Sequence, residues 1–302
     1  MAADLATEVP AGLEPLVERI RERCGPALRA IVLYGSTRRN ANVHDGLVDL
    51  MAIVRDYRSV HGAGLAALFN RLLPPNVYYL EAGPESARVR CKYIIVSEPS
   101  FRKRTAGGLD GYFWARFTQP CRLVWSADDA AIAFVAECRA RAAVHFATEA
   151  LHLGNGAISA TDFWRRAVSA TYRCELRPEP PDAARALIER DPEFWEGLSE
   201  ALLPALEGVT PADDGLYRIE LSKRRRFTGR LRWTLRRGWS KLLNVMRLFK
   251  AAGTFANGVD YLSWKIERHS GVKVKVTDAM RRHPRLASWK LLIRMWRNGA
   301  LG

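Results

Sequence analysis

The stretch IVLYGSTRRNANVHDGLVDLMAIV, residues 31–54, decides the expected fold. An apolar run of β-forming residues, 30–34, stops at Gly35-Ser36, and a second apolar run, 47–54, carries Asp49. This pattern predicts two strands around a Gly-Ser turn. Such a turn lets backbone N–H groups and the Ser36 hydroxyl approach a triphosphate, and a carboxylate on the neighbouring strand can anchor Mg²⁺. An ordinary hairpin fits the same pattern, so both interpretations stand.

The charge of the chain is distributed unevenly along its 302 residues. From residue 216 onward there are 22 Lys and Arg against 4 Asp and Glu, whereas residues 1–215 hold 25 against 28. The 48% apolar content is that of a globular protein, and no apolar run is long enough to predict a transmembrane helix. We therefore expect a nearly neutral body and a cationic C-terminal third with an anionic partner: nucleic acid, acidic lipid or a phosphate-bearing substrate.

Cysteine and histidine spacing excludes several classes of site. The five cysteines are scattered and form no C-x-x-C pair, which argues against a disulfide framework and against zinc. The six histidines form no H-x-x-x-H or H-E-x-x-H motif, so we expect no structural metal. The acidic N-terminus has the character of neither a signal peptide nor a transit peptide, and we expect the protein to stay where it is made.

Periodicity predicts an α/β fold with two domains and a tail. The first domain, residues 1–130, combines helices with strands, which are expected at 30–34, 47–54, 76–81, 88–97 and 121–125. The second, residues 131–212, is helical, with helices at 130–153, at 162–172 after a Ser159 cap, and at 181–206 with a break at Pro192. A hinge at 211–215 leads into a basic C-terminal region, residues 213–302.

The basic region has an amphipathic pattern. Lys223-Arg224-Arg225-Arg226 opens an alternation of basic and aromatic residues that continues to Lys241, and residues 286, 289, 293 and 296 repeat apolar side chains at helical spacing. Cationic helices with Trp on the apolar side lie in membrane interfaces, where each cation near an anionic surface contributes about 1 kcal/mol. Two alternatives stay open: a helix packed on its own domain, and RNA binding without an RRM, KH or zinc-finger signature.

Several short motifs occur in the order known from one protein family. They are Tyr34-Gly35-Ser36 with Asp49, His61, Asn76-Val77-Tyr78-Tyr79, Lys92-Tyr93, Arg116-Phe117-Thr118-Gln119-Pro120, Tyr172 to Arg177, and the stretch from Lys250 to Lys265. In these motifs and their order the chain resembles the mitochondrial-type phosphatidate cytidylyltransferases, the translocator assembly and maintenance family of CDP-diacylglycerol synthases, which has bacterial relatives.

The resemblance implies a fold, a reaction and a location. The fold is a nucleotidyltransferase-type mixed sheet with a winged-helix-like second domain and a C-terminal amphipathic segment. The reaction is CTP plus phosphatidic acid to CDP-diacylglycerol and pyrophosphate, with Mg²⁺. We accordingly expect a cytoplasmic protein, peripherally bound to the inner face of the cell membrane through its tail, with CTP and phosphatidic acid as partners and no specific nucleic acid.

Phosphoryl-transfer logic assigns expected roles to individual residues. Gly35 and Ser36 would hold phosphates, and Asp49 would bind the metal. A phosphate nucleophile is already ionised near neutral pH, so charge neutralisation should matter more than a base. Lys92 and Arg116 are the candidates for neutralisation, with surface charge as the alternative role.

Further candidates are less specific. Arg38 and Arg39, beside the turn, are possible phosphate ligands, and His61 is a possible nucleotide contact or a structural residue. Asp45 and Glu81 are candidates for a second metal-binding carboxylate.

Two other functions stay open. One is transfer of a nucleotide to a different phosphorylated acceptor. The other is non-catalytic binding of acidic lipid or RNA on a nucleotidyltransferase fold, because Leu47 and Met51 stand where an Asp-x-Asp motif would place a second carboxylate beside Asp49.

Overall fold

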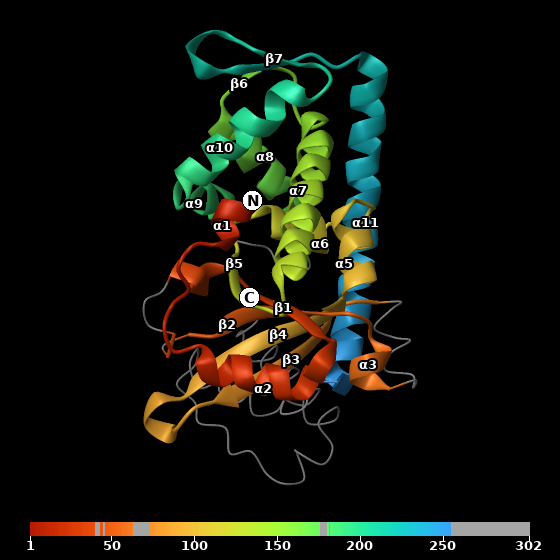
Figure 1. The fold of residues 1–302 in the computed structure, drawn as a ribbon. Helices are drawn as coiled ribbons and strands as arrows, with labels where there is room; N and C mark the ends of the chain where they lie inside the picture. Colours follow the sequence, from red (N-terminus) through yellow and green to blue (C-terminus); the bar gives the residue numbers. More distant parts are fainter. Residues whose placement is uncertain (40–42, 45, 63–72, 176–179, 181, 255–302) are drawn as a thin grey trace.

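The central feature of the fold is a mixed β-sheet (Figure 1). The computed structural model describes residues 1–302 except 40–42, 45, 63–72, 176–179, 181 and 255–302. The described residues form a five-stranded sheet in the order β3-β4-β2-β1-β5, in which β2 and β4 are parallel and the other neighbours antiparallel. Its strands are β1 (Leu28–Tyr34), β2 (Val48–Val54), β3 (Asn76–Ala82), β4 (Val89–Ser97) and β5 (Arg122–Ser126). The predicted α/β class and these five strands are confirmed.

Helices cover both faces of this sheet because its inner strands are apolar on both sides. On one face, α2 (Glu14–Cys24) buries Leu16, Ile20 and Cys24, which its four-residue spacing places in one stripe. The other face carries α1 (Ala2–Leu5), α5 (Glu98–Thr105), α6 (Tyr112–Thr118) and the first half of α7 (Asp129–Leu151). The short helix α3 (Arg58–His61) follows β2.

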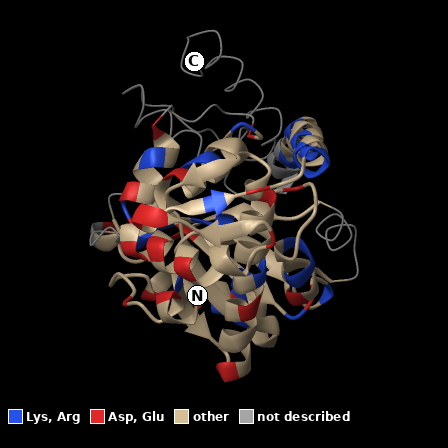
Figure 2. Ribbon diagram, turned by 90° about the horizontal axis from the view of Figure 1, so that it is seen from above, with Lys and Arg blue, Asp and Glu red and all other residues tan. Residues whose placement is uncertain are grey.

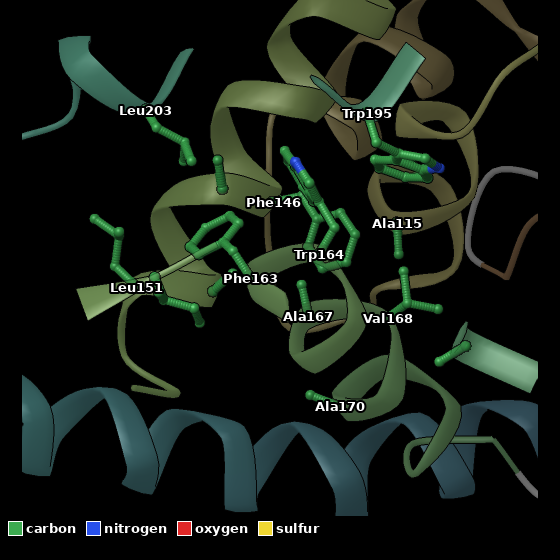
Figure 3. Packing of buried hydrophobic residues seen from close by; sticks show 14 of the residues in the cluster. Ala115, Phe146, Leu151, Phe163, Trp164, Ala167, Val168, Ala170, Trp195 and Leu203 are labelled. Atoms are coloured by element: carbon green, nitrogen blue, oxygen red, sulfur yellow. The ribbon is translucent and has the colours of Figure 1, made fainter. Parts of the chain in front are cut away.

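A second core lies beyond the sheet, around three aromatic side chains (Figure 3). Phe146, Trp164 and Trp195 are buried and pack on one another, and the Trp164 indole donates to Ser199 Oγ at 2.8 Å. The surrounding elements are α8 (Ala160–Tyr172), α9 (Ala183–Glu189), α10 (Pro192–Leu202) and a small sheet of β6 (Gly156–Ile158), β8 (Tyr217–Ile219) and β7 (Val209–Pro211). Ser159 caps α8 by accepting from the Asp162 N–H, as predicted.

The two cores share one helix. Val135 and Cys138 of α7 pack against the large sheet, whereas Phe146 and Ala150 of the same helix belong to the second core. The boundary expected at residue 130 thus coincides with the start of a helix that joins both cores. The segment expected as a hinge, 211–215, instead connects β7 to β8 through a short 3₁₀ turn, Asp213–Gly215.

The first part of the basic region is a long helix, α11 (Lys223–Thr254), which runs beside both cores (Figure 1). Trp233 is only 2% exposed and belongs to the second core, and its indole donates to the Glu149 carbonyl at 3.0 Å. One face of α11 is therefore packed on its own protein, which was one of the alternatives for this region. The apolar repeat at 286–296 lies outside the described residues. None of the helices in the described part of the chain has the length and apolar character that a membrane span requires.

Alanine substitutions at two glycines of α11 test this packing, because they should change the stability of the protein in opposite directions. A Cβ at Gly229 would lie 2.1 Å from His152 Cγ, whereas one at Gly238 meets nothing within 4 Å. Gly229→Ala should destabilise the protein by about 1–3 kcal/mol through overpacking. Gly238→Ala should stabilise it by about 0.5–1 kcal/mol, because Ala is the better helix former. Urea unfolding of both variants measures the difference, and equal effects would contradict the docking of α11.

Candidate active site

The sheet register places four side chains in one row across neighbouring strands. Tyr34 of β1 lies opposite Asp49 of β2, Asp49 beside Lys92 of β4, and Lys92 opposite Tyr79 of β3. Because side chains alternate between the faces of a sheet, these residues share the face that α6 and α7 cover. Lys92 Nζ lies 3.1 Å from Asp49 Oδ1, so the row holds an ion pair at its centre.

Gly35 brings the backbone directly against Asp49. It follows β1 with a φ of +80°, a conformation that L side chains rarely adopt, and a Cβ on it would lie 3.0 Å from Asp49 Oδ2. Gly35 and Ser36 are exposed. The turn therefore presents backbone and a hydroxyl to solvent beside a carboxylate, as the sequence predicts.

A cleft of ≈ 830 Å³ opens at this corner of the sheet. Five residues singled out in the sequence line it together: Gly35, Ser36, Arg38, Asp49 and Arg116. The rest of its wall comes from α6, from segments around α8 and α9, and from α11. Clefts that bind small molecules commonly have volumes of about 300–1,000 Å³, and this cleft falls within that range.

Positive charge concentrates beside Asp49. Burial alone would lower the pKa of Lys92, but the Asp49 carboxylate and the Tyr112 phenol offset this and the pKa is raised, so Lys92 stays charged. The Arg116 guanidinium lies 4.5 Å from the ring centre of Tyr112 and 5.7 Å from that of Tyr34, and 3.9 Å from the Glu175 carboxylate. Burial raises the pKa of Tyr34 well above its usual value, so this phenol stays neutral. Asp49, beside the Gly-Ser turn, thus pairs with the charged Lys92, and Arg116 lies near Tyr34, the residue before the turn.

Arg38 has a structural partner. Its side chain is 8% exposed and forms an ion pair with Asp191, the residue that precedes α10. Arg38 therefore ties the segment after the Gly-Ser turn to the second core while it lines the cleft. The side chain of Arg39 and all of Asp45 lie outside what the structure describes.

Two other candidates lie away from Asp49. His61 stacks between Tyr57 and Tyr78, at centroid distances of 6.4 and 6.3 Å. Tyr78 points to the α2 face of the sheet, opposite to the face that carries Asp49, and His61 does not line the cleft. Glu81 accepts from the Tyr79 hydroxyl and pairs with Arg88 and Arg90 at 3.5 and 3.3 Å, also outside the cleft lining.

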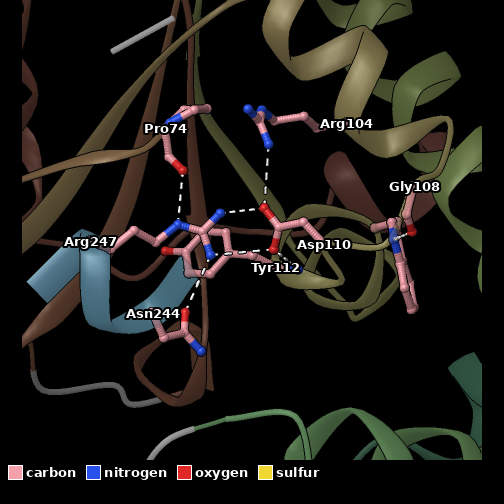
Figure 4. A network of polar contacts seen from close by, with 8 residues as sticks. Pro74, Arg104, Gly108, Asp110, Tyr112, Asn244 and Arg247 are labelled. Carbon is pink, nitrogen blue, oxygen red and sulfur yellow. Dashed lines mark hydrogen bonds and ion pairs between the residues drawn. The ribbon is translucent and has the colours of Figure 1, made fainter. Parts of the chain in front are cut away.

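The wall that α11 and the residues just before α6 supply was not predicted from the sequence. Asp110, which precedes α6, accepts from Arg104 at 3.3 Å and from Arg247 of α11, and Arg247 also donates to the Pro74 carbonyl at 3.0 Å (Figure 4). Asp110 and Arg247 both line the cleft, with Arg236, Ser240 and Asn244. Positions 236, 240, 244 and 247 recur every three or four residues, so the polar stripe of a helix was the available signal.

The donor set near Asp49 restricts how a metal would be held. Within the described residues, no three His, Cys, Asp or Glu side chains form a metal-binding group. Mg²⁺ commonly keeps several waters and is bound by one or two carboxylates together with substrate phosphates. Asp49 fits that role for Mg²⁺ that arrives with a nucleotide, and Lys92 would then share the carboxylate.

Comparisons with known proteins add little to this geometry. No family model matches the chain, and no curated protein matches it. Among solved structures the chain is similar to a nucleotidyltransferase-like protein from Exiguobacterium sibiricum, with 10% sequence identity and a TM-score of 0.27, over 94% of this chain and 90% of that one. A TM-score this low does not establish a shared fold, and the mixed α/β class rests on the sheet itself.

The contact between Gly35 and Asp49 is testable through stability. Gly35→Ala should lose about 1–2 kcal/mol from its positive φ and more from the clash with Asp49. Gly25→Ala is the matched control, because Gly25 also has a positive φ, +53°, but nothing within 4 Å of its Cβ position. In a denaturant double-mutant cycle, Asp49→Ala should recover part of the loss caused by Gly35→Ala and none of that caused by Gly25→Ala. Full additivity at both positions would contradict the contact.

Proposed function

We propose that this protein transfers a nucleotide from a nucleoside triphosphate to a phosphorylated acceptor in the cleft beside Asp49. The observation that supports this most directly is the meeting of the Gly35-Ser36 turn with the Asp49–Lys92 ion pair at the cleft corner. Backbone without a side chain can approach phosphates closely, and fixed cations stabilise charge that develops during transfer.

The chemistry requires positioning more than proton transfer. A phosphate oxygen of the acceptor attacks the α-phosphorus, and pyrophosphate leaves as the bond to the β-phosphate breaks. The Gly35-Ser36 turn binds the leaving phosphates, and Lys92 and Arg116 neutralise charge around the α-phosphate. Mg²⁺, when bound with the nucleotide at Asp49, supplies further charge neutralisation. The acceptor phosphate is already ionised, so no side chain has to act as a base.

The more specific proposal names CTP and phosphatidic acid, giving CDP-diacylglycerol. It is supported by the collinear motifs that resemble phosphatidate cytidylyltransferases. Of their residues, Gly35, Ser36, Asp49 and Arg116 line the cleft, and Lys92 pairs with Asp49 from outside the lining. His61 then acts as a structural residue on the other face of the sheet.

The outer face of α11 supports membrane docking in this proposal. Large apolar side chains form an exposed stripe at helical spacing: Phe227, Leu231, Leu235, Trp239, Leu242, Val245 and Met246. The basic residues Arg230, Arg237 and Lys241 are exposed beside it, and the helix has no Asp or Glu (Figure 2). An apolar stripe flanked by cations binds an anionic lipid surface through burial and charge together.

Binding without catalysis is the competing function. Asp49 already has a cationic partner in Lys92, and this pairing would also stabilise a fold that turns over no substrate. RNA is a possible ligand of the basic face in that case. Turnover separates this function from the proposed one.

Substitution of Asp49 tests the transfer. Protein incubated with phosphatidic acid vesicles, Mg²⁺ and each labelled nucleoside triphosphate in turn should form CDP-lipid from CTP. Asp49→Asn should reduce the rate by about 100-fold or more, because the carboxylate that would bind Mg²⁺ beside the reacting phosphates is lost. Glu81→Gln, a carboxylate outside the cleft, is the control and should keep the rate. Transfer from another nucleotide would refute CTP specificity, and no transfer by the wild type would favour binding alone.

Vesicle sedimentation tests the outer face of α11. The triple variant Leu231→Ser, Leu235→Ser, Trp239→Ser should bind anionic vesicles about 100-fold more weakly, because apolar area no longer enters the bilayer. Val144→Ser, at a 44% exposed apolar side chain on α7, should bind as the wild type does. Deleting residues 223–302 is unsuitable, since Trp233 belongs to the core. Undiminished binding of the triple variant would refute this face as the anchor.

A further inference from the structure

The inner face of α11 presents two buried polar side chains to the cleft. Arg236 is 1% exposed and Ser240 is 5% exposed, and both line the cleft. They are four residues apart, so they lie on the same side of the helix, one turn from each other. Neither belongs to the corner formed by Gly35, Ser36 and Asp49.

Both side chains carry polar atoms without a partner. Arg236 uses one nitrogen, Nη2, which donates to Glu149 Oε2 at 3.0 Å and more weakly to the Gly108 carbonyl at 3.5 Å. Its Nε and Nη1, and the Ser240 Oγ, are buried and have no hydrogen-bond partner among the described residues. Buried polar groups are nearly always hydrogen-bonded, so these atoms indicate a ligand that completes them.

The surroundings hold the Arg236 guanidinium between two indole rings and a carboxylate. It lies 4.5 Å from the ring centre of Trp233 and 5.0 Å from that of Trp114. Glu149 also pairs with Arg232 at 2.5 Å, so one carboxylate faces two guanidinium groups. The cluster of Arg232, Arg236 and Glu149 therefore has one positive charge in excess, and Arg236 has a fixed orientation. Both features suit an anion with several acceptor oxygens.

We propose that Arg236 and Ser240 form a second anion subsite, which binds the phosphate monoester of the acceptor. The nucleotide phosphates occupy the corner at Gly35, Ser36 and Asp49. This assignment rests on the proposed transfer, which needs two anions in one cleft. Both residues line the cleft, so a phosphate that binds there would approach the unpartnered Nε and Nη1 of Arg236 and Oγ of Ser240.

Equilibrium binding tests the subsite without requiring turnover. Titration calorimetry on the full chain measures CTP, inorganic phosphate and glycerol 3-phosphate separately. Vesicles containing phosphatidic acid are compared with vesicles of equal charge containing phosphatidylglycerol, a phosphodiester. Ser240→Ala should weaken binding of the monoesters about 3- to 10-fold, and Arg236→Lys about 10-fold or more, since Lys cannot reproduce the planar donor edge. Arg165→Lys, at an exposed arginine of α8 outside the cleft lining, is the control.

The outcomes separate the subsite from the function. Weaker binding of monoesters with unchanged CTP affinity supports the subsite, and it does so even if the wild type transfers no nucleotide. A preference for phosphatidic acid vesicles over the soluble monoesters identifies a lipid headgroup as the source of the phosphate. Unchanged monoester binding in Ser240→Ala and Arg236→Lys, or an equal loss of CTP binding, overturns the proposal. Because Ser240 Oγ has no partner to lose among the described residues, Ser240→Ala keeps the test valid if Arg236→Lys unfolds.

Discussion

The buried carboxylate of Glu149 fixes the position of α11, and the cleft depends on that position. Burial would raise the pKa of Glu149, but Arg236 and Arg232 outweigh burial and the pKa is lowered, so the group is charged in the folded protein. A buried charge that loses its partners is strongly unfavourable. Both partners come from α11, and Trp233 of the same helix donates to the Glu149 carbonyl, so these contacts together stabilise the observed register of α11 on α7.

This register gives α11 two different surfaces. Its inner side supplies Arg236, Ser240 and Arg247 to the cleft, while its outer side exposes an apolar stripe that includes Leu235 and Trp239. A helix repeats every 3.6 residues, so neither surface can be rotated without displacing the other. A ligand bound against this wall of the cleft therefore contacts α11, the same helix that would contact a membrane. The proposed docking and the proposed transfer are coupled through this helix.

The sequence predicted the sheet and the Gly-Ser turn beside Asp49 because both depend on local patterns. Alternation and the Gly-Ser break placed Asp49 and Lys92 on strands, and the strand register then brought them to 3.1 Å. The wall formed by α11 was missed because it depends on tertiary packing. In sequence, its basic residues resemble a solvated tail, and only their contacts with the buried Glu149 and the half-buried Asp110 show which arginines turn inward. His61 was grouped with the site because it follows β2 closely, although the alternation of β3 places its partner Tyr78 on the other face.

The arginines around the cleft differ in what they can offer to a ligand. Arg38 is matched by Asp191 and Arg116 by Glu175, so each of these cations has a carboxylate partner. Asp110 and Glu149 are each shared by two guanidinium groups, which leaves one positive charge in excess at each of the two positions. A phosphate binds most favourably where it neutralises an excess positive charge without breaking an existing ion pair. That condition is met along the α6–α11 wall, whereas the Gly-Ser corner offers Lys92 only in competition with Asp49. The proposed transfer places two anions in one cleft. Mg²⁺ bound with the nucleotide would help to neutralise the phosphates at the corner, and arginine would neutralise the acceptor phosphate at the wall.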